Sequence, residues 1–201
     1  PRSTLFPYTT FFRSALPRRG LPAPIVAPIA SDGSNADSAV TQVMAGNAAA
    51  VLLITAGNSS PAFMKALLKT DYRPMLYGLS VISAKQLIRE LGDEAHGLVI
   101  AQVMPSPFRV DYPFVREYRQ AADKAGQTYS HTALEGYMAA RSFAEALRRA
   151  GRDINREKLV IALESLGDWD AGGMKLGYSA RRRNGLDYVD LAIISRGKFN
   201  R

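Results

Sequence analysis

The chain has 201 residues, 47% of them hydrophobic, which is ordinary for one large globular domain or for parts of two. Much of its net charge of +8 lies in clusters such as Arg18-Arg19 and Arg181-Arg182-Arg183. No aromatic residues interleave with them as base stacking requires, which argues against a nucleic-acid partner. The sequence has no cysteine and no apolar run near the ~20 residues that span a bilayer, so disulfides, thiolate catalysis and membrane insertion are not expected.

The first 20 residues show neither a helical nor a strand period. Within them, the stretch from Thr4 to Ser14 is one substitution away from the conceptual translation of a widely used sequencing-library adapter. We therefore interpret residues 1–20 as a non-native, adapter-derived leader and exclude it from fold reasoning. No signal peptide is visible, and we expect that it was lost together with the true N-terminal part.

From Leu21 onward, strand-like and helix-like segments alternate, which predicts βαβ units and a doubly wound parallel sheet. A β-prone run at residues 25–29 comes first, although its prolines weaken a strand there. Buried strands are expected at residues 49–55, 75–79 and 98–104, and the first is apolar throughout, as in strands buried on both faces. The helices between and after them are marked by apolar residues at helical spacing: Val40, Val43 and Met44; Phe63, Ala66 and Leu67; Ala84, Leu87, Ile88 and Leu91; Phe114, Val115, Tyr118 and Ala122.

The alternation ends in the last third of the chain. The segments expected there are two successive helices, 130–150 and 156–166, and then a strand pair, at about 174–178 and 188–194. The first of these helices is the longest helical pattern in the sequence. Ser130 is placed to cap its start and Gly151 to end it.

Two strand ends carry the candidate binding residues. Ligands of open α/β sheets bind outside the carboxyl ends of the parallel strands. The turn after the first buried strand contains Gly57, Asn58 and Ser59, and it opens a helix whose first N–H groups can hold a carboxylate. The alternative interpretation is an ordinary capped turn, because Ser and Asn cap helices in many proteins. Ser80 follows the end of the next strand.

The sequence offers little support for catalysis or metal binding. Its two histidines, His96 and His131, are not at metal-ligand spacing, so no metal site is expected. No nucleophile elbow, phosphate-binding loop or dinucleotide-binding motif occurs. We therefore expect neither an enzyme nor a bound cofactor.

Several long stretches carry a family resemblance. LEGYMAARSFAEALRRAG, followed by NREKLVIALESL, is similar to the C-terminal region of type 1 periplasmic substrate-binding proteins. The middle, from IRELGDEAHGLVIAQVMPSPF to FVREYRQAADKAG, and the closing GYSARRRNGLDYVDLAIISRGKFNR agree with it. These proteins serve ABC importers of the branched-chain amino acid class, the leucine-binding protein family. The resemblance runs from about residue 20 to the end.

The resemblance implies two lobes and a site between strands and crossing helices. Residues 21–127 would form a complete α/β lobe, and residues 128–201 the crossing helices and hinge strands of a second, truncated lobe. His131 begins the crossing helix near the expected ligand cleft. Relatives that bind branched-chain amino acids often have an aromatic residue near the position of Gly57 and, near that of Ser80, an acid that pairs with the ligand ammonium. With Gly and Ser at these positions, the resemblance implies that the missing lobe recognises the ammonium or that the ligand is not a simple amino acid.

The resemblance implies a solute-binding component of an ABC importer. In the periplasm, it would capture a small polar ligand by hinge closure, either an amino acid or a related carboxylate or amide. It would then deliver this ligand to a membrane permease. Two alternatives stay open. A ligand-sensing domain of a regulator or receptor shares the fold, and an attached DNA-binding or kinase segment would identify it. A doubly wound transferase-like enzyme would need acidic metal ligands or a phosphate loop at a strand end.

Overall fold

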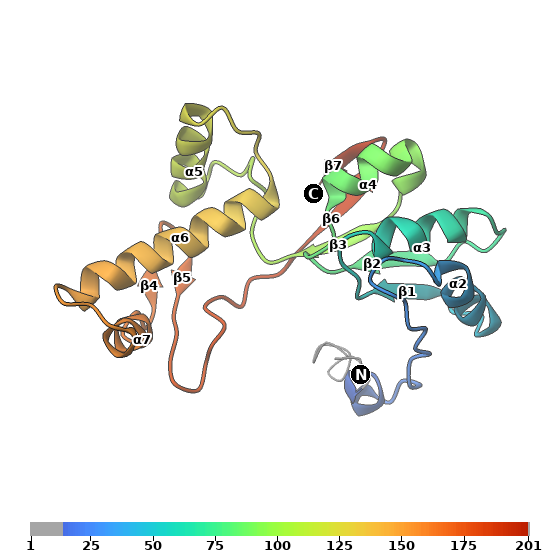
Figure 1. Ribbon diagram of the computed structural model, residues 1–201, viewed down its shortest axis with the longest axis horizontal. Coiled ribbons are helices and arrows are strands. Elements are labelled where there is room, and N and C mark those ends of the chain that lie inside the picture. Colours follow the sequence, from blue (N-terminus) through green and yellow to red (C-terminus); the bar gives the residue numbers. More distant parts are fainter. Residues whose placement is uncertain (1–13, 201) are drawn as a thin grey trace. The chain divides into compact units, whose positions relative to one another are not determined.

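The computed structural model describes residues 14–200, which fall into two compact units (Figure 1). The first unit holds the described residues up to Ala101 and those from Leu191 onward, and the second holds Gln102–Asp190. The chain therefore passes between the units twice. Most of the expected leader lies outside the described residues. Within its described end, the short 3₁₀ helix η1 (Pro17–Arg19) buries no side chain.

The first unit is built on a five-stranded sheet in the order β1-β2-β3-β6-β7. The strands are β1 (Ala50–Leu53), β2 (Met75–Gly78), β3 (Val99–Gln102), β6 (Asp190–Ser195) and β7 (Lys198–Asn200). The first three strands are parallel neighbours, with Leu53 opposite Gly78 and Gly78 opposite Ile100, whereas β6 and β7 are antiparallel. The α/β fold with a largely parallel sheet that the sequence predicts is therefore confirmed.

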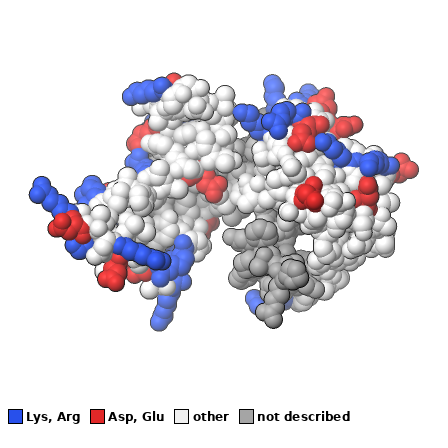
Figure 2. Space-filling model, in the orientation of Figure 1, with Lys and Arg blue, Asp and Glu red and all other residues white. Residues whose placement is uncertain are grey.

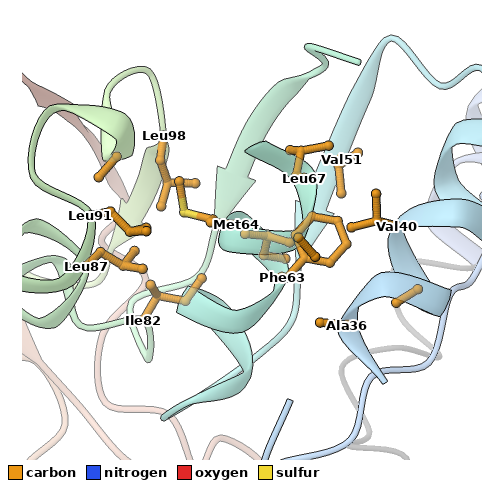
Figure 3. Packing of buried hydrophobic residues seen from close by; sticks show 14 of the residues in the cluster. Ala36, Val40, Val51, Phe63, Met64, Leu67, Ile82, Leu87, Leu91 and Leu98 are labelled. Carbon is orange, nitrogen blue, oxygen red and sulfur yellow. The ribbon is translucent and has the colours of Figure 1, made fainter. Parts of the chain in front are cut away.

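Helices cover one face of this sheet. They are α2 (Ala36–Ala45), α3 (Ser59–Leu68) and α4 (Ala84–Leu91), the last followed by the 3₁₀ turn η2 (Gly92–Ala95). Figure 3 shows the core that they form, in which Phe63 of α3 points toward Val40 of α2. A chain that steps repeatedly across a parallel sheet in one direction leaves its right-handed connections on the same face, which explains why α3 and α4 share a face.

The opposite face of β1 is open to solvent among the described residues. Val51 and Leu53 are buried in the core, but Leu52 between them is 39% exposed. Side chains alternate across a strand, so Leu52 points to the face that these helices do not cover. The expectation that this strand is buried on both faces is therefore wrong.

Residues 25–29 form an irregular segment and not a strand. Pro24 and Pro28 have no N–H to donate to a strand neighbour, which explains the absence of a ladder here. The side chain of Asn35 holds the segment instead. Its Oδ1 accepts from the backbone N–H of Ala30 at 2.7 Å, and its Nδ2 donates to the carbonyl oxygen of Pro28 at 3.1 Å.

The second unit is mainly helical. It contains α5 (Pro113–Lys124), α6 (His131–Ala150), α7 (Arg156–Glu164) and a two-stranded antiparallel sheet of β4 (Trp169–Asp170) and β5 (Lys175–Leu176). The long helix expected at residues 130–150 is confirmed: the Ser130 Oγ accepts from the backbone N–H of Ala133 at 3.1 Å, and Gly151 ends the helix at a φ of 72°. The expected pairing of the last two strands is wrong, because β5 pairs with β4 and β6 joins the first-unit sheet.

The boundary between the units differs from the one expected after residue 127. Helix α5 belongs to the second unit, where Phe114 and Tyr118 pack in one cluster with Leu134 and Met138 of α6. At the other end, Ile194 of β6 is fully buried in the core of the first unit. Packing partners thus place α5 with the later helices and the closing strands with the earlier ones.

Candidate functional site

Four of the five predicted binding residues lie at one edge of the first-unit sheet. Strands β1 and β2 are parallel and end in register, Leu53 opposite Gly78. The turns that follow them therefore leave the sheet at the same carboxyl edge. Gly57 and Asn58 lie in the first turn, Ser59 follows as the first residue of α3, and Ser80 lies in the second turn. This edge is where ligands of open α/β sheets bind.

The first turn combines a glycine in the left-handed conformation with polar groups held by hydrogen bonds. Gly57 has a φ of +58°, a left-handed conformation that favours glycine, and open space surrounds its Cα. Ser59 is buried, and its hydroxyl donates to the carbonyl oxygen of Ala56 at 2.8 Å. Ser60, also buried, lies with its Oγ 2.8 Å from the Oγ1 of Thr55. These bonds hold the start of α3 against the end of β1.

Asn58 precedes α3 but does not cap it with its side chain. Its Oδ1 accepts a hydrogen bond from the Nε2 of Gln86 on α4, at 3.2 Å. Sequence reasoning missed Gln86. The two residues are 28 positions apart, and only the packing of α3 beside α4 brings them together, so no local pattern could have pointed to this contact.

The second turn is short and uncharged. Ser80 is half-buried, and its hydroxyl has no hydrogen-bond partner among residues 14–200. Ser83, three residues on, caps α4 by accepting from the backbone N–H of Gln86 at 3.2 Å. Residues 54–60 and 79–83 include no Asp, Glu, Lys or Arg, so the donors and acceptors of both turns are neutral.

His131 belongs to the second unit, where it is the first residue of α6. The residue is half-buried, and burial lowers the pKa of its imidazole, while the negative charge of Asp190 acts in the opposite direction. Asp190 is itself held by Tyr188, whose hydroxyl donates to Oδ2 at 3.1 Å. His131 thus has an acidic neighbour within its own unit.

A cavity of about 410 Å³ lies at the opposite, amino-terminal edge of the first-unit sheet. Met75 and Val99, the first residues of β2 and β3, line it together with Leu67 of α3 and the charged or titratable Arg73 and His96. The cavity therefore lies at one edge of the sheet, and the polar side chains of the two turns lie at the other. We place the candidate site at the carboxyl edge, because the convergent hydroxyl and amide groups lie there, whereas the cavity wall is mostly apolar.

Charges of both signs alternate on the surface seen in Figure 2. On α6, for example, Glu145 pairs with Arg148 and Arg149 at 2.8 Å each. Within residues 14–200, no three His, Asp or Glu side chains are grouped as metal ligands would be. Nor does any helix in that range have the length and apolarity to cross a membrane.

Comparison with known proteins identifies the family of this chain. The family model for periplasmic binding proteins matches residues 9–195 of the chain. A substrate-binding periplasmic protein from Ralstonia solanacearum has a TM-score of 0.80 and 27% identity over 96% of this chain and 56% of its own. An extracellular ligand-binding receptor from Verminephrobacter eiseniae has a TM-score of 0.74 and 30% identity over 86% of this chain and 50% of its own. No match was found among the curated proteins.

A branched-chain amino acid ABC transporter structure from Thermus thermophilus, with bound valine, shares the fold with a TM-score of 0.73 at 16% identity, over 93% of this chain and 53% of its own. The chain spans about half the length of these solved structures. The resemblance seen in the sequence is confirmed, because the family match covers most of the residues. The chain belongs to the type 1 periplasmic binding protein family.

Proposed function

We propose that the chain acts in the solute-binding component of an ABC importer, where it captures a small polar ligand such as an amino acid or a related carboxylate or amide. The family is one of ligand-binding proteins, and the Thermus thermophilus relative of this fold was solved with valine. Ligand binding followed by release to a membrane permease involves no bond chemistry, so we assign no catalytic residue. This role belongs in the periplasm or an equivalent extracytoplasmic space.

The observation that carries the proposal is the shared carboxyl edge of β1 and β2. Two neighbouring parallel strands end there in uncharged turns rich in small polar residues. We propose ligand contacts from Gly57, Asn58, Ser59 and Ser80 in the first unit. For the second unit we propose a contact from His131, whose pKa, lowered by burial, favours the neutral imidazole at pH 7.

Hinge closure is the proposed binding motion. The chain passes between the units after Ala101 and again after Asp190, so two backbone connections link them. A few residues at such connections can absorb the change in backbone angles while each unit stays rigid. The separate cores of the two units are consistent with such motion.

A titration followed by nuclear magnetic resonance tests the site directly. The ¹⁵N-labelled chain is titrated with millimolar valine, leucine, glutamine and isovalerate, concentrations at which weak binding is visible. We expect the largest amide shifts at residues 57–60 and 79–81. Amide signals of Met75 and Val99, at the opposite edge, serve as the matched control. Shifts concentrated at those two residues would contradict the proposed site.

A further inference from the structure

A series of hydrogen-bonded side chains connects the surface of the first unit to Asn58. It starts at Glu90 on α4, whose Oε2 lies 2.8 Å from the Nζ of Lys65 on α3. The other carboxylate oxygen, Oε1, accepts from the Nε2 of Gln86 at 3.0 Å. The hydrogen bond from Lys65, followed by that from Gln86, lowers the pKa of Glu90. At neutral pH Glu90 is therefore ionised and can only accept hydrogen bonds.

The chemistry of Glu90 determines how Gln86 is oriented. A carboxamide has one accepting oxygen and one donating NH₂ group, and only the NH₂ group can face an ionised carboxylate. The same NH₂ group has a second hydrogen, which is donated to the Oδ1 of Asn58 at 3.2 Å. Gln86 therefore turns its donor toward both neighbours. This orientation follows from the acceptor-only character of Glu90 and not from a choice between similar atoms.

The orientation of Asn58 follows in turn. Its Oδ1 must face Gln86, so its Nδ2 group is turned away from Gln86. The Oδ1 makes no capping bond to α3. The Nδ2 group has no hydrogen-bond partner among the described residues. At the carboxyl edge of the sheet, the side chain of Asn58 thus holds its oxygen toward Gln86 and leaves both Nδ2 hydrogens unpaired within residues 14–200.

We propose that Gln86 is a positioning residue that fixes the Asn58 carboxamide as a hydrogen-bond donor, so that this position binds an acceptor group of the ligand, a carboxylate or carbonyl, and not an ammonium. The inference rests on the proposed function for the location of the ligand. It is consistent with the two flanking turns, which contain no acidic side chain that could pair with a ligand ammonium.

The orientation is tested without ligand, through the side-chain NH₂ signals of Asn58 and Gln86 in the ¹⁵N-labelled chain. In Gln86→Glu the new carboxylate can only accept, so Asn58 must turn its Nδ2 toward it, and we expect a downfield shift of the Asn58 NH₂ signals. Gln86→Leu removes the bond without reversing it. Glu94→Gln is the control, because it changes a carboxylate that pairs with no described residue. Asn58 NH₂ signals that are the same in wild type and Gln86→Glu would overturn the proposal.

Selectivity is tested with two ligand halves of matched shape, isovalerate and isoamylamine. We expect isovalerate, and not isoamylamine, to shift the signals of residues 57–60 in the wild type. Gln86→Leu should weaken isovalerate binding by about fivefold, the equivalent of one neutral hydrogen bond. Equal shifts with the amine would overturn the inference while leaving the site in place. If neither compound, nor any amino acid, shifts this edge, the proposed site fails, and the inference fails with it.

Discussion

The hydroxyls of Thr55 and Ser60 lie 2.8 Å apart, joining the end of β1 to the first turn of α3. Ser60 is only 2% exposed, so a hydroxyl left without its partner here is costly. We expect Ser60→Ala or Thr55→Val alone to lower the free energy of unfolding by about 1–2 kcal/mol. The double variant should lose less than the sum of the two, because no unpaired hydroxyl remains.

Urea denaturation of the two single variants and the double variant measures this coupling. Ser38→Ala, at an exposed serine of α2 whose side chain makes no hydrogen bond with a described residue, is the matched control. Strictly additive losses would show that the two hydroxyls do not interact in solution.

Two glycines with similar backbone angles should respond differently to alanine. Gly33 and Gly57 have φ values of 77° and 58°. A Cβ on Gly33 would lie 2.4 Å from the Cβ of Ala62, whereas a Cβ on Gly57 would meet open space. We expect Gly57→Ala to cost about 1 kcal/mol, from backbone conformation alone. Gly33→Ala should cost at least about 2 kcal/mol more, because the overlap must be relieved by moving a packed helix.

Thermal or urea unfolding of both variants provides the comparison. Since the backbone term is common to both sites, the difference between them isolates the steric contact. Equal destabilisation would mean that the segment around Gly33 moves freely away from α3.

Stability at low pH should depend on Glu145. Hydrogen bonds from Arg148 and Arg149 lower the pKa of this carboxyl to about 2 from its usual 4.5. A depressed folded-state pKa contributes stability that is present above the unfolded-state value and is lost as the pH falls toward the folded-state value. We therefore expect the difference in unfolding free energy between wild type and Glu145→Gln to shrink between pH 4.5 and 2.

A ¹³C titration of the Glu145 carboxyl gives the midpoint directly. Glu135→Gln, on the same helix, controls for the general effect of removing a negative charge. A midpoint for Glu145 at its ordinary value would show that the two arginines do not hold it in solution.

Protonation of His131 should lower the free energy of unfolding as the pH falls from neutral. Burial lowers its pKa below the usual 6.5, so the unfolded chain binds a proton more readily than the folded one. The stability linked to this group is present above pH 6.5 and is lost as the pH drops through the folded-state value. We expect His131→Gln to flatten this part of the pH–stability curve.

Asp190 opposes the effect of burial on His131. In Asp190→Asn the folded-state pKa of His131 should fall further, which the His131 ring signals report by nuclear magnetic resonance. Asp168→Asn, also in the second unit, is the control. An unchanged His131 pKa in Asp190→Asn would show that the carboxylate does not act on the ring.

The local patterns predicted the elements well because burial repeats with the period of each element. Continuous apolar runs located β1, β2 and β3, and the parallel arrangement then placed Asn58 and Ser80 at one edge. Partners between distant segments could not be predicted. A periodic stripe shows that Tyr118 is buried but not that Leu134 lies in the same cluster, and a polar residue such as Gln86 has no periodic signal at all.

The return of the chain to the first unit after Asp190 has a consequence for synthesis. Ile194 of β6 fills the core of the first unit, so that sheet cannot be completed until the last strands have left the ribosome. The second unit is continuous in sequence, from Gln102 to Asp190, and all of it emerges earlier. A nascent chain from which β6 has not yet emerged would hold a complete helical unit and an unfinished sheet whose apolar residues lack their partner strand, and exposed apolar surface of this kind favours aggregation during synthesis.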